Sequence, residues 1–150
     1  NIQVIWQTGK SYYDDCKIKA QEHIGKWLIC TDFLGRMDLS YAIADLVISR
    51  AGASSISELC LLGKPCILVP SPNVAEDHQT HNAMALVSKN AAVMVKDIDA
   101  KKEMVTTSLD ILNNEEQLTA LQKNILALAQ KDSARRIAEE VIKLAKQMQK

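Results

Sequence analysis

Short apolar runs alternate with segments of helical periodicity through residues 2–95. Runs of this length predict strands, and their alternation with helices is typical of a parallel sheet covered by helices on both faces. The predicted strands are residues 2–6, 27–30, 45–49, 66–69 and 91–95, and the predicted helices are residues 12–23, 37–44, 56–62 and 77–89. The first strand is expected to be buried. The pattern therefore predicts the α/β class.

The remaining residues, 99–150, show helical periodicity only. Apolar residues recur at helical spacing, and they include Ile125, Leu128, Ile137, Val141 and Leu144. We expect this helical tail to pack on the sheet or to reach across to another domain. Because the sequence shows no internal repeat and no low-complexity linker, one compact domain is the simplest organisation.

The charges balance, with 18 lysines and arginines against 18 aspartates and glutamates. No net field therefore attracts nucleic acid or an anionic membrane over a distance, and any anion site must be local. A chain of 150 residues is long enough to bury an ordinary core as one domain.

The cysteines and the start of the chain predict where the protein resides. Cys16, Cys30, Cys60 and Cys66 have neither CxxC spacing nor the density of a secreted disulfide scaffold, so we expect reduced, mostly buried thiols. No run approaches the ~20 apolar residues that span a bilayer, and residues 1–6 lack signal-peptide features. We expect a soluble, intracellular chain. Its abrupt start in a strand suggests a piece of a longer protein.

The best-marked unit is the turn at residues 50–55, which leads from a predicted strand into helix 56–62. Gly63 is suited to the left-handed conformation that ends a helix, and Pro65 prevents continuation. Ligands of open α/β sheets bind at the carboxyl ends of strands, where helix starts offer unpaired N–H groups. Gly52 allows close approach of a ligand, and Ser54 and Ser55 add hydroxyl groups, so the turn is suited to a diphosphate.

Glu58 lies one turn into the same helix. A carboxylate beside a phosphate site is repulsive unless it faces neutral hydroxyls, and the two hydroxyls of a ribose can both donate to it. Local spacing leaves another interpretation equally open, because residues 55–58 match a capping box in which Glu58 folds back on the helix start. Gly52 could likewise serve only a tight turn.

A second polar segment, residues 71–82, follows the predicted strand at 66–69. Gln79 can both donate and accept hydrogen bonds, which suits sugar hydroxyls, and Asn82 lies on the same helical face. The alternative is a solvated helix start capped by Asp77, with His78 and His81 on the surface. A metal site that joins both histidines to Glu76 is a weaker alternative, since it lacks another firm ligand.

Several segments together resemble the carboxy-terminal domain of the MurG family, the UDP-N-acetylglucosamine:undecaprenyl-pyrophosphoryl-muramoyl-pentapeptide N-acetylglucosaminyltransferases. The segments are SRAGASSISE at residues 49–58, Gly63-Lys64-Pro65, Val69-Pro70, Asp77-His78-Gln79 and Asn82-Ala83. The similarity extends over nearly the whole chain. It implies a Rossmann-like parallel sheet with flanking helices, one half of a GT-B glycosyltransferase, with a helical carboxy-terminal tail.

The resemblance also implies roles for individual residues. Glu58 would bind the ribose hydroxyls, Ser54 and Ser55 the diphosphate, and Gln79 the N-acetylglucosamine hydroxyls. Phe33 and Leu34 lie where the family holds uracil, largely through backbone groups. The full set of predicted nucleotide-sugar-binding residues is Phe33, Leu34, Arg50, Gly52, Ser54, Ser55, Glu58, His78, Gln79 and Asn82. His78 stands where the family often has a glutamine. Neither a metal nor a cofactor is predicted.

The resemblance implies an inverting transferase that moves N-acetylglucosamine from its UDP donor to lipid I, forming lipid II for peptidoglycan, cell shape and division. The enzyme would work at the inner face of the bacterial membrane, with peripheral association. By this resemblance the domain's first strand, its phosphate loop and the acceptor domain are absent from this sequence, so no catalytic residue is predicted and the chain alone is expected to be inactive. The alternatives are a subunit of a split UDP-N-acetylglucosamine transferase and a non-enzymatic flavodoxin-like module.

Overall fold

The computed structural model describes residues 2–73 and 77–148. The chain divides into two compact units, Asn1–Ala44 and Asp45–Lys150. The organisation as one compact domain stays a prediction.

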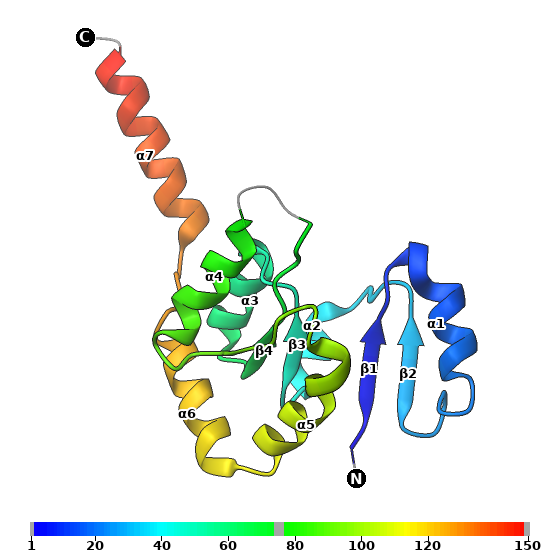
Figure 1. Cartoon of the computed structure of the whole chain (residues 1–150). Helices are drawn as coiled ribbons and strands as arrows, with labels where there is room; N and C mark the ends of the chain where they lie inside the picture. Colours follow the sequence, from blue (N-terminus) through cyan, green and yellow to red (C-terminus); the bar gives the residue numbers. More distant parts are fainter. Residues whose placement is uncertain (1, 74–76, 149–150) are drawn as a thin grey trace. The chain divides into compact units, whose positions relative to one another are not determined.

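The first unit contains a pair of parallel strands and two short helices. Its elements are β1 (Val4–Gln7), the 3-10 helix η1 (Lys10–Tyr12), α1 (Tyr13–Ala20), β2 (Leu28–Thr31) and α2 (Met37–Ile43). The register pairs Gln7 with Thr31 at the carboxyl ends of the strands. Helix α1 lies beside β2 (Figure 1). The predicted strands and helices of this region are confirmed, with ends shifted by a few residues.

The expectation of a buried first strand is wrong. Val4 and Trp6 of β1 are 37% and 41% exposed. The physical reason is that the first unit pairs β1 with a single strand, and two strands bury little apolar surface. The predicted helix at 12–23 also ends early, at Ala20, because the following residues form turns that include Gly25 at φ 79°.

The second unit is built around a sheet of three parallel strands in the order β3-β4-β5. Its elements are β3 (Val47–Ser49), α3 (Ala53–Leu62), β4 (Cys66–Leu68), α4 (His78–Val87), β5 (Val93–Met94), α5 (Ala100–Leu112), α6 (Glu115–Leu126) and α7 (Ser133–Met148). Two right-handed crossovers in one direction place α3 and α4 on the same face of such a sheet. A groove lined by both helices agrees with this placement.

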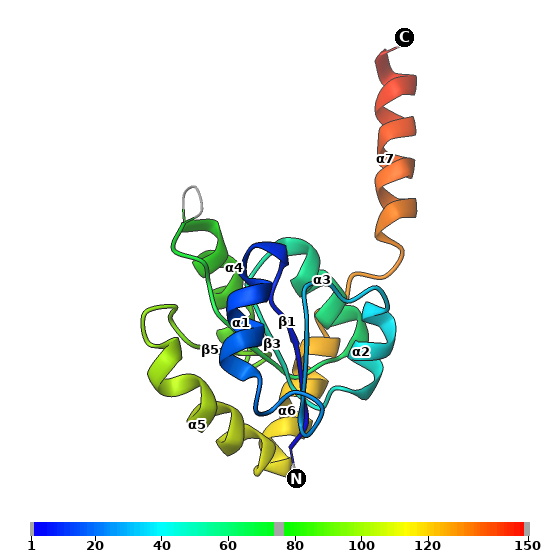
Figure 2. The same cartoon turned by 90° about the vertical axis from the view of Figure 1, so that its right-hand side faces the viewer.

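The core of the second unit lies around the central strand β4, which is buried along its length. Ile67 of β4 packs with Val95, Ile111 of α5 and Leu121 of α6. Helices α5 and α6 pack together across a short turn (Figure 2). The expectation that the helical tail packs on the sheet is therefore confirmed for α5 and α6. In α7, by contrast, the described side chains at 133–147 are all exposed.

Helix α3 ends as its sequence predicts but begins earlier. Gly63 adopts the left-handed conformation, with φ 62° and ψ 37°, and the Lys64 N–H donates to the Leu59 carbonyl over 3.0 Å. The predicted start at residue 56 is wrong. The Ile56 N–H donates to the Gly52 carbonyl over 3.0 Å, so the helix already begins at Ala53 and contains both serines.

The four cysteines are free thiols; Cys60 and Cys66 are buried, and Cys16 and Cys30 are half-buried. Burial raises the pKa of Cys66 to about 12, with a smaller contribution from neighbouring Cys60, whose own pKa is raised by burial. Within the described residues, none of the helices combines the length and the apolar character that crossing a membrane requires.

Candidate functional site

The start of α3 presents backbone N–H groups at the carboxyl end of β3. The first helical bond runs from the Ile56 N–H to Gly52, so the N–H groups of residues 53–55 come before the i to i−4 ladder. Gly52 has φ −72° and ψ 144°, a conformation open to other residues, and an added Cβ would meet only the Ser55 hydroxyl oxygen, at 4.0 Å. The turn itself therefore does not require a glycine at position 52, and the open space suits a close ligand.

Ser54, Ser55 and Glu58 lie on α3 itself. Ser54 and Ser55 are the second and third residues of the helix, and Glu58 follows one turn later on the same side, with an exposed side chain. The capping box predicted with Ser55 as the cap is wrong, because the N-cap is Gly52, which has no side chain. The hydroxyls and the carboxylate thus border the same helix start.

Arg50 follows one strand and bonds to residues that follow two others. It follows β3, and its Nη1 donates to Asp97 Oδ1 over 2.5 Å and to the carbonyl oxygens of Val69 and Pro70 over 3.4 Å. Asp97 comes shortly after β5, and Val69 and Pro70 directly follow β4. The guanidinium therefore holds the loop that leads into α3. Asp97 was not among the predicted residues, because a lone carboxylate 47 positions from Arg50 carries no local signal.

Two predicted sugar-binding side chains of α4 also form hydrogen bonds to the backbone of neighbouring loops. Asn82 Nδ2 donates to the Ala51 carbonyl over 3.1 Å, and Ala51 is fully buried. Gln79 Oε1 accepts the Ser71 N–H over 2.9 Å. The structure thus joins α4 both to the loop before α3 and to the loop after β4.

The start of α4 carries exposed histidines. His78 is its first residue, and His81 is exposed as well. Asp77 occupies the N-cap position in the left-handed conformation, but its carboxylate accepts the Thr80 hydroxyl over 2.7 Å and makes no cap bond to the backbone. Glu76, the further ligand of the metal alternative, lies outside the described residues. The part of the chain that is described holds no cluster of metal-binding side chains.

Phe33 and Leu34 belong to the first unit, in the turn after β2. The Phe33 side chain is 67% exposed. The Leu34 N–H donates to Gln7 Oε1 over 2.9 Å, and the Thr31 hydroxyl donates to the Phe33 carbonyl over 3.1 Å.

Residues 1–144 match the model of the glycosyltransferase family 28 C-terminal domain. The chain belongs to this family. Two relatives carry the name UDP-N-acetylglucosamine--N-acetylmuramyl-(pentapeptide) pyrophosphoryl-undecaprenol N-acetylglucosamine transferase. The one from Parabacteroides distasonis is 59% identical over 144 residues, 96% of this chain and 39% of that protein. The one from Cytophaga hutchinsonii is 52% identical over 143 residues, 95% of this chain and 38% of that protein. The family 28 domain thus spans about two fifths of the length of these relatives.

A solved structure confirms the fold of this family 28 domain. The crystal structure of Acinetobacter baumannii MurG matches it with a TM-score of 0.81 at 25% identity, over 94% of this chain and 41% of that one. The predicted α/β fold with parallel strands, flanking helices and a helical tail is confirmed, as is the resemblance to the carboxy-terminal domain of MurG.

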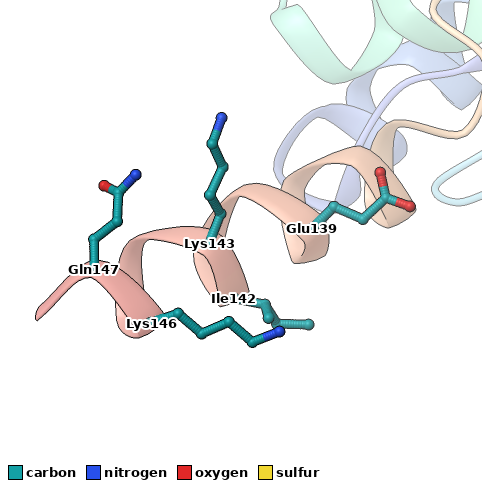
Figure 3. Close-up of a pocket in the computed structure, with 5 residues that line it drawn as sticks. All are labelled: Glu139, Ile142, Lys143, Lys146 and Gln147. Carbon is teal, nitrogen blue, oxygen red and sulfur yellow. The ribbon is translucent and has the colours of Figure 1, made fainter. Parts of the chain in front are cut away.

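Two surface hollows of the family 28 domain lie apart from the predicted site. The residues that border the first, Glu139, Ile142, Lys143, Lys146 and Gln147, all come from α7 (Figure 3). Side chains of one exposed helix cannot enclose a ligand, so we assign no site there. The second, of about 330 Å³, lies between α3, α4 and the segment after α6, and is lined by Ile56, Ser57, Cys60, Ala85, Leu86, Lys89, Ala127, Leu128 and Gln130. Neither set includes a predicted donor-binding residue.

Proposed function

We propose that this chain is the donor-binding domain of an inverting glycosyltransferase that moves N-acetylglucosamine from its UDP donor to lipid I, forming lipid II. The observation that carries the proposal is the start of α3, with its N–H groups, open Gly52 and the Glu58 carboxylate one turn on, in a family 28 domain. The names of its relatives supply the donor and acceptor.

Each chemical group of the donor has predicted partners in the chain. Its diphosphate would meet the N–H groups and hydroxyls of Ser54 and Ser55, where the helix dipole favours negative charge. The ribose hydroxyls would donate to Glu58, and the uracil would contact the Phe33–Leu34 turn. Gln79 and His78 lie at the start of α4, where the sugar would be held.

The domain would accelerate transfer by stabilising the leaving group. As an acceptor hydroxyl attacks the anomeric carbon, negative charge grows on the departing UDP, and N–H groups fixed at a helix start stabilise that charge without reorganising. Acceptor binding and proton removal would belong to the part of the enzyme outside this sequence. That part would also associate with the inner face of the membrane. The chain alone would therefore bind the donor without transferring the sugar.

The binding test uses the ¹⁵N-labelled chain, titrated by NMR with UDP-N-acetylglucosamine, UDP and ADP. We expect the two uridine ligands to shift signals around the start of α3 and the Phe33–Leu34 turn, and to bind more tightly than ADP. Equal affinity for ADP would favour a general α/β module and contradict the proposal.

Glu58→Ala tests the ribose contact. We expect UDP binding to weaken by about 1.5–3 kcal/mol through loss of charge-assisted hydrogen bonds, which is roughly ten- to 150-fold. Glu116→Ala, which removes an exposed glutamate from the first turn of α6, is the matched control and leaves affinity unchanged. Unchanged UDP affinity in folded Glu58→Ala would exclude the ribose role.

A transfer assay with a lipid-linked acceptor tests the division of labour. We expect the chain alone to give no product. Measurable transfer would show that the catalytic groups lie within these 150 residues.

A further inference from the structure

In the turn after β2, one side chain bonds to the carbonyl of a peptide unit and another bonds to the N–H of the same peptide. The Phe33 carbonyl accepts the Thr31 hydroxyl over 3.1 Å, and the Leu34 N–H of the same peptide donates to Gln7 Oε1 over 2.9 Å. Gln7 and Thr31 are the last residues of β1 and β2 and are partners in the strand register. Their side chains therefore emerge on the same face of the strand pair and hold the same peptide.

The residues that follow β1 also bond to the end of β2 and to the first residue of the turn. The Thr8 N–H and hydroxyl both donate to the Thr31 carbonyl, over 2.9 and 3.2 Å, and the Gly9 N–H donates to the Asp32 carbonyl over 3.1 Å. The Phe33 side chain is largely exposed, so its burial does not fix the turn. The conformation of the turn is instead fixed by hydrogen bonds from residues 7–9 and 31.

We propose that Gln7 and Thr31 are positioning residues for the base of the nucleotide. The inference rests on the proposed function, in which the Phe33–Leu34 turn contacts uracil through backbone groups. With its carbonyl and its N–H both engaged, the peptide between residues 33 and 34 keeps one orientation. The neighbouring backbone groups are then arranged before the ligand arrives, and binding loses less conformational freedom.

The same arrangement provides selectivity between pyrimidines. Uracil presents a donor at N3 and an acceptor at position 4, whereas cytosine presents the opposite pattern. A backbone held in one orientation favours one of these patterns. A turn released from Gln7 and Thr31 can adapt to either, so selectivity falls together with affinity.

The experiment compares Gln7→Ala, Thr31→Val and the double variant by NMR titration with UDP and CDP. We expect each single variant to bind UDP about three- to tenfold more weakly, the range for one hydrogen bond, with a smaller change for CDP. The double variant should lose less than the product of the single losses, because one lost bond already frees the peptide. Thr31→Ser keeps the hydroxyl and should bind UDP as the parent does.

Gln3→Ala is the matched control, because Gln3 is an exposed glutamine that precedes the other end of β1. In the unliganded chain the Leu34 amide signal should move in Gln7→Ala and stay in Gln3→Ala. Failure of the parent chain to bind UDP would overturn both the proposed function and this inference. If the parent chain binds UDP and both Gln7→Ala and Thr31→Val bind it with equal or higher affinity, the proposed function stands and the positioning role is overturned.

Discussion

Replacing Asn82 distinguishes an anchor of the donor loop from a direct sugar ligand. The side chain donates to the carbonyl of fully buried Ala51, in the loop between β3 and α3. In Asn82→Ala the carbonyl loses its partner, which costs about 1–3 kcal/mol. Alanine regains about 0.6 kcal/mol in helix propensity. We therefore expect the free energy of unfolding to fall by about 0.5–2.5 kcal/mol.

Asn124→Ala is the matched control. Asn124 Nδ2 donates to the Asn90 carbonyl over 3.0 Å, a bond of the same kind in a more exposed place. Losing an exposed bond costs about 0.5–1.5 kcal/mol, and the same gain in propensity reduces the net loss to about 0–1 kcal/mol. Because none of the predicted donor residues takes part in this bond, we expect unchanged affinity for UDP.

The assay combines urea unfolding, followed by circular dichroism, with titrations of UDP and UDP-N-acetylglucosamine. If Asn82 anchors the loop that meets the diphosphate, its loss should lower the affinity for both ligands by the same factor. For one hydrogen bond that factor is about three- to tenfold. If the Asn82 side chain instead contacts the sugar, the substitution should weaken the binding of UDP-N-acetylglucosamine alone. Unchanged stability together with a loss confined to the sugar nucleotide would refute the anchoring role.

The remaining predictions concern the end of α3 and the four cysteines. Gly63→Ala should lower the free energy of unfolding by about 1 kcal/mol, because a left-handed alanine costs about 1–2 kcal/mol, partly offset in the unfolded chain, and its Cβ would lie 3.3 Å from Leu126 Cβ. Thermal unfolding measures the loss of stability, with Gly35→Ala as the control because a Cβ there would meet no neighbour within 4 Å. Equal losses of stability in the two variants would contradict the role of Gly63 as a left-handed cap. Native Cys60 and Cys66 should resist iodoacetamide while Cys16 and Cys30 react, as mass spectrometry of the labelled chain can show. Because the folded pKa of Cys66 is raised, its contribution to stability is fully present below the ordinary thiol value of 9.0 and is lost as the pH rises toward about 12. Rapid labelling of Cys60 and Cys66 at neutral pH, or a free energy of unfolding that stays constant as the pH rises from 9.0 toward about 12, would contradict their burial.

The candidate site shows where local sequence is informative and where it fails. Gly63 and Pro65 marked the end of α3 correctly, because the cap depends on the conformations of adjacent residues alone. The start was predicted three residues late, since Ser55 is an acceptable cap as well as an acceptable first-turn residue. The choice between them depended on the bond from Ile56 to Gly52, which only the folded backbone displays.

Local sequence patterns were sufficient for the α/β class, the five strands, the four helices before residue 90 and the family, because periodicity and short motifs are properties of neighbouring residues. The folded structure was needed to show that Arg50 meets Asp97, that Asn82 bonds to Ala51, and that Gln7 and Thr31 bond to one peptide. Arg50 lies 47 positions from Asp97, Asn82 lies 31 positions from Ala51, and Gln7 lies 27 positions from Leu34, so only the fold brings these partners together. A strand is also buried only when neighbouring elements cover it, which is why the apolar run of β1 could not reveal its exposure.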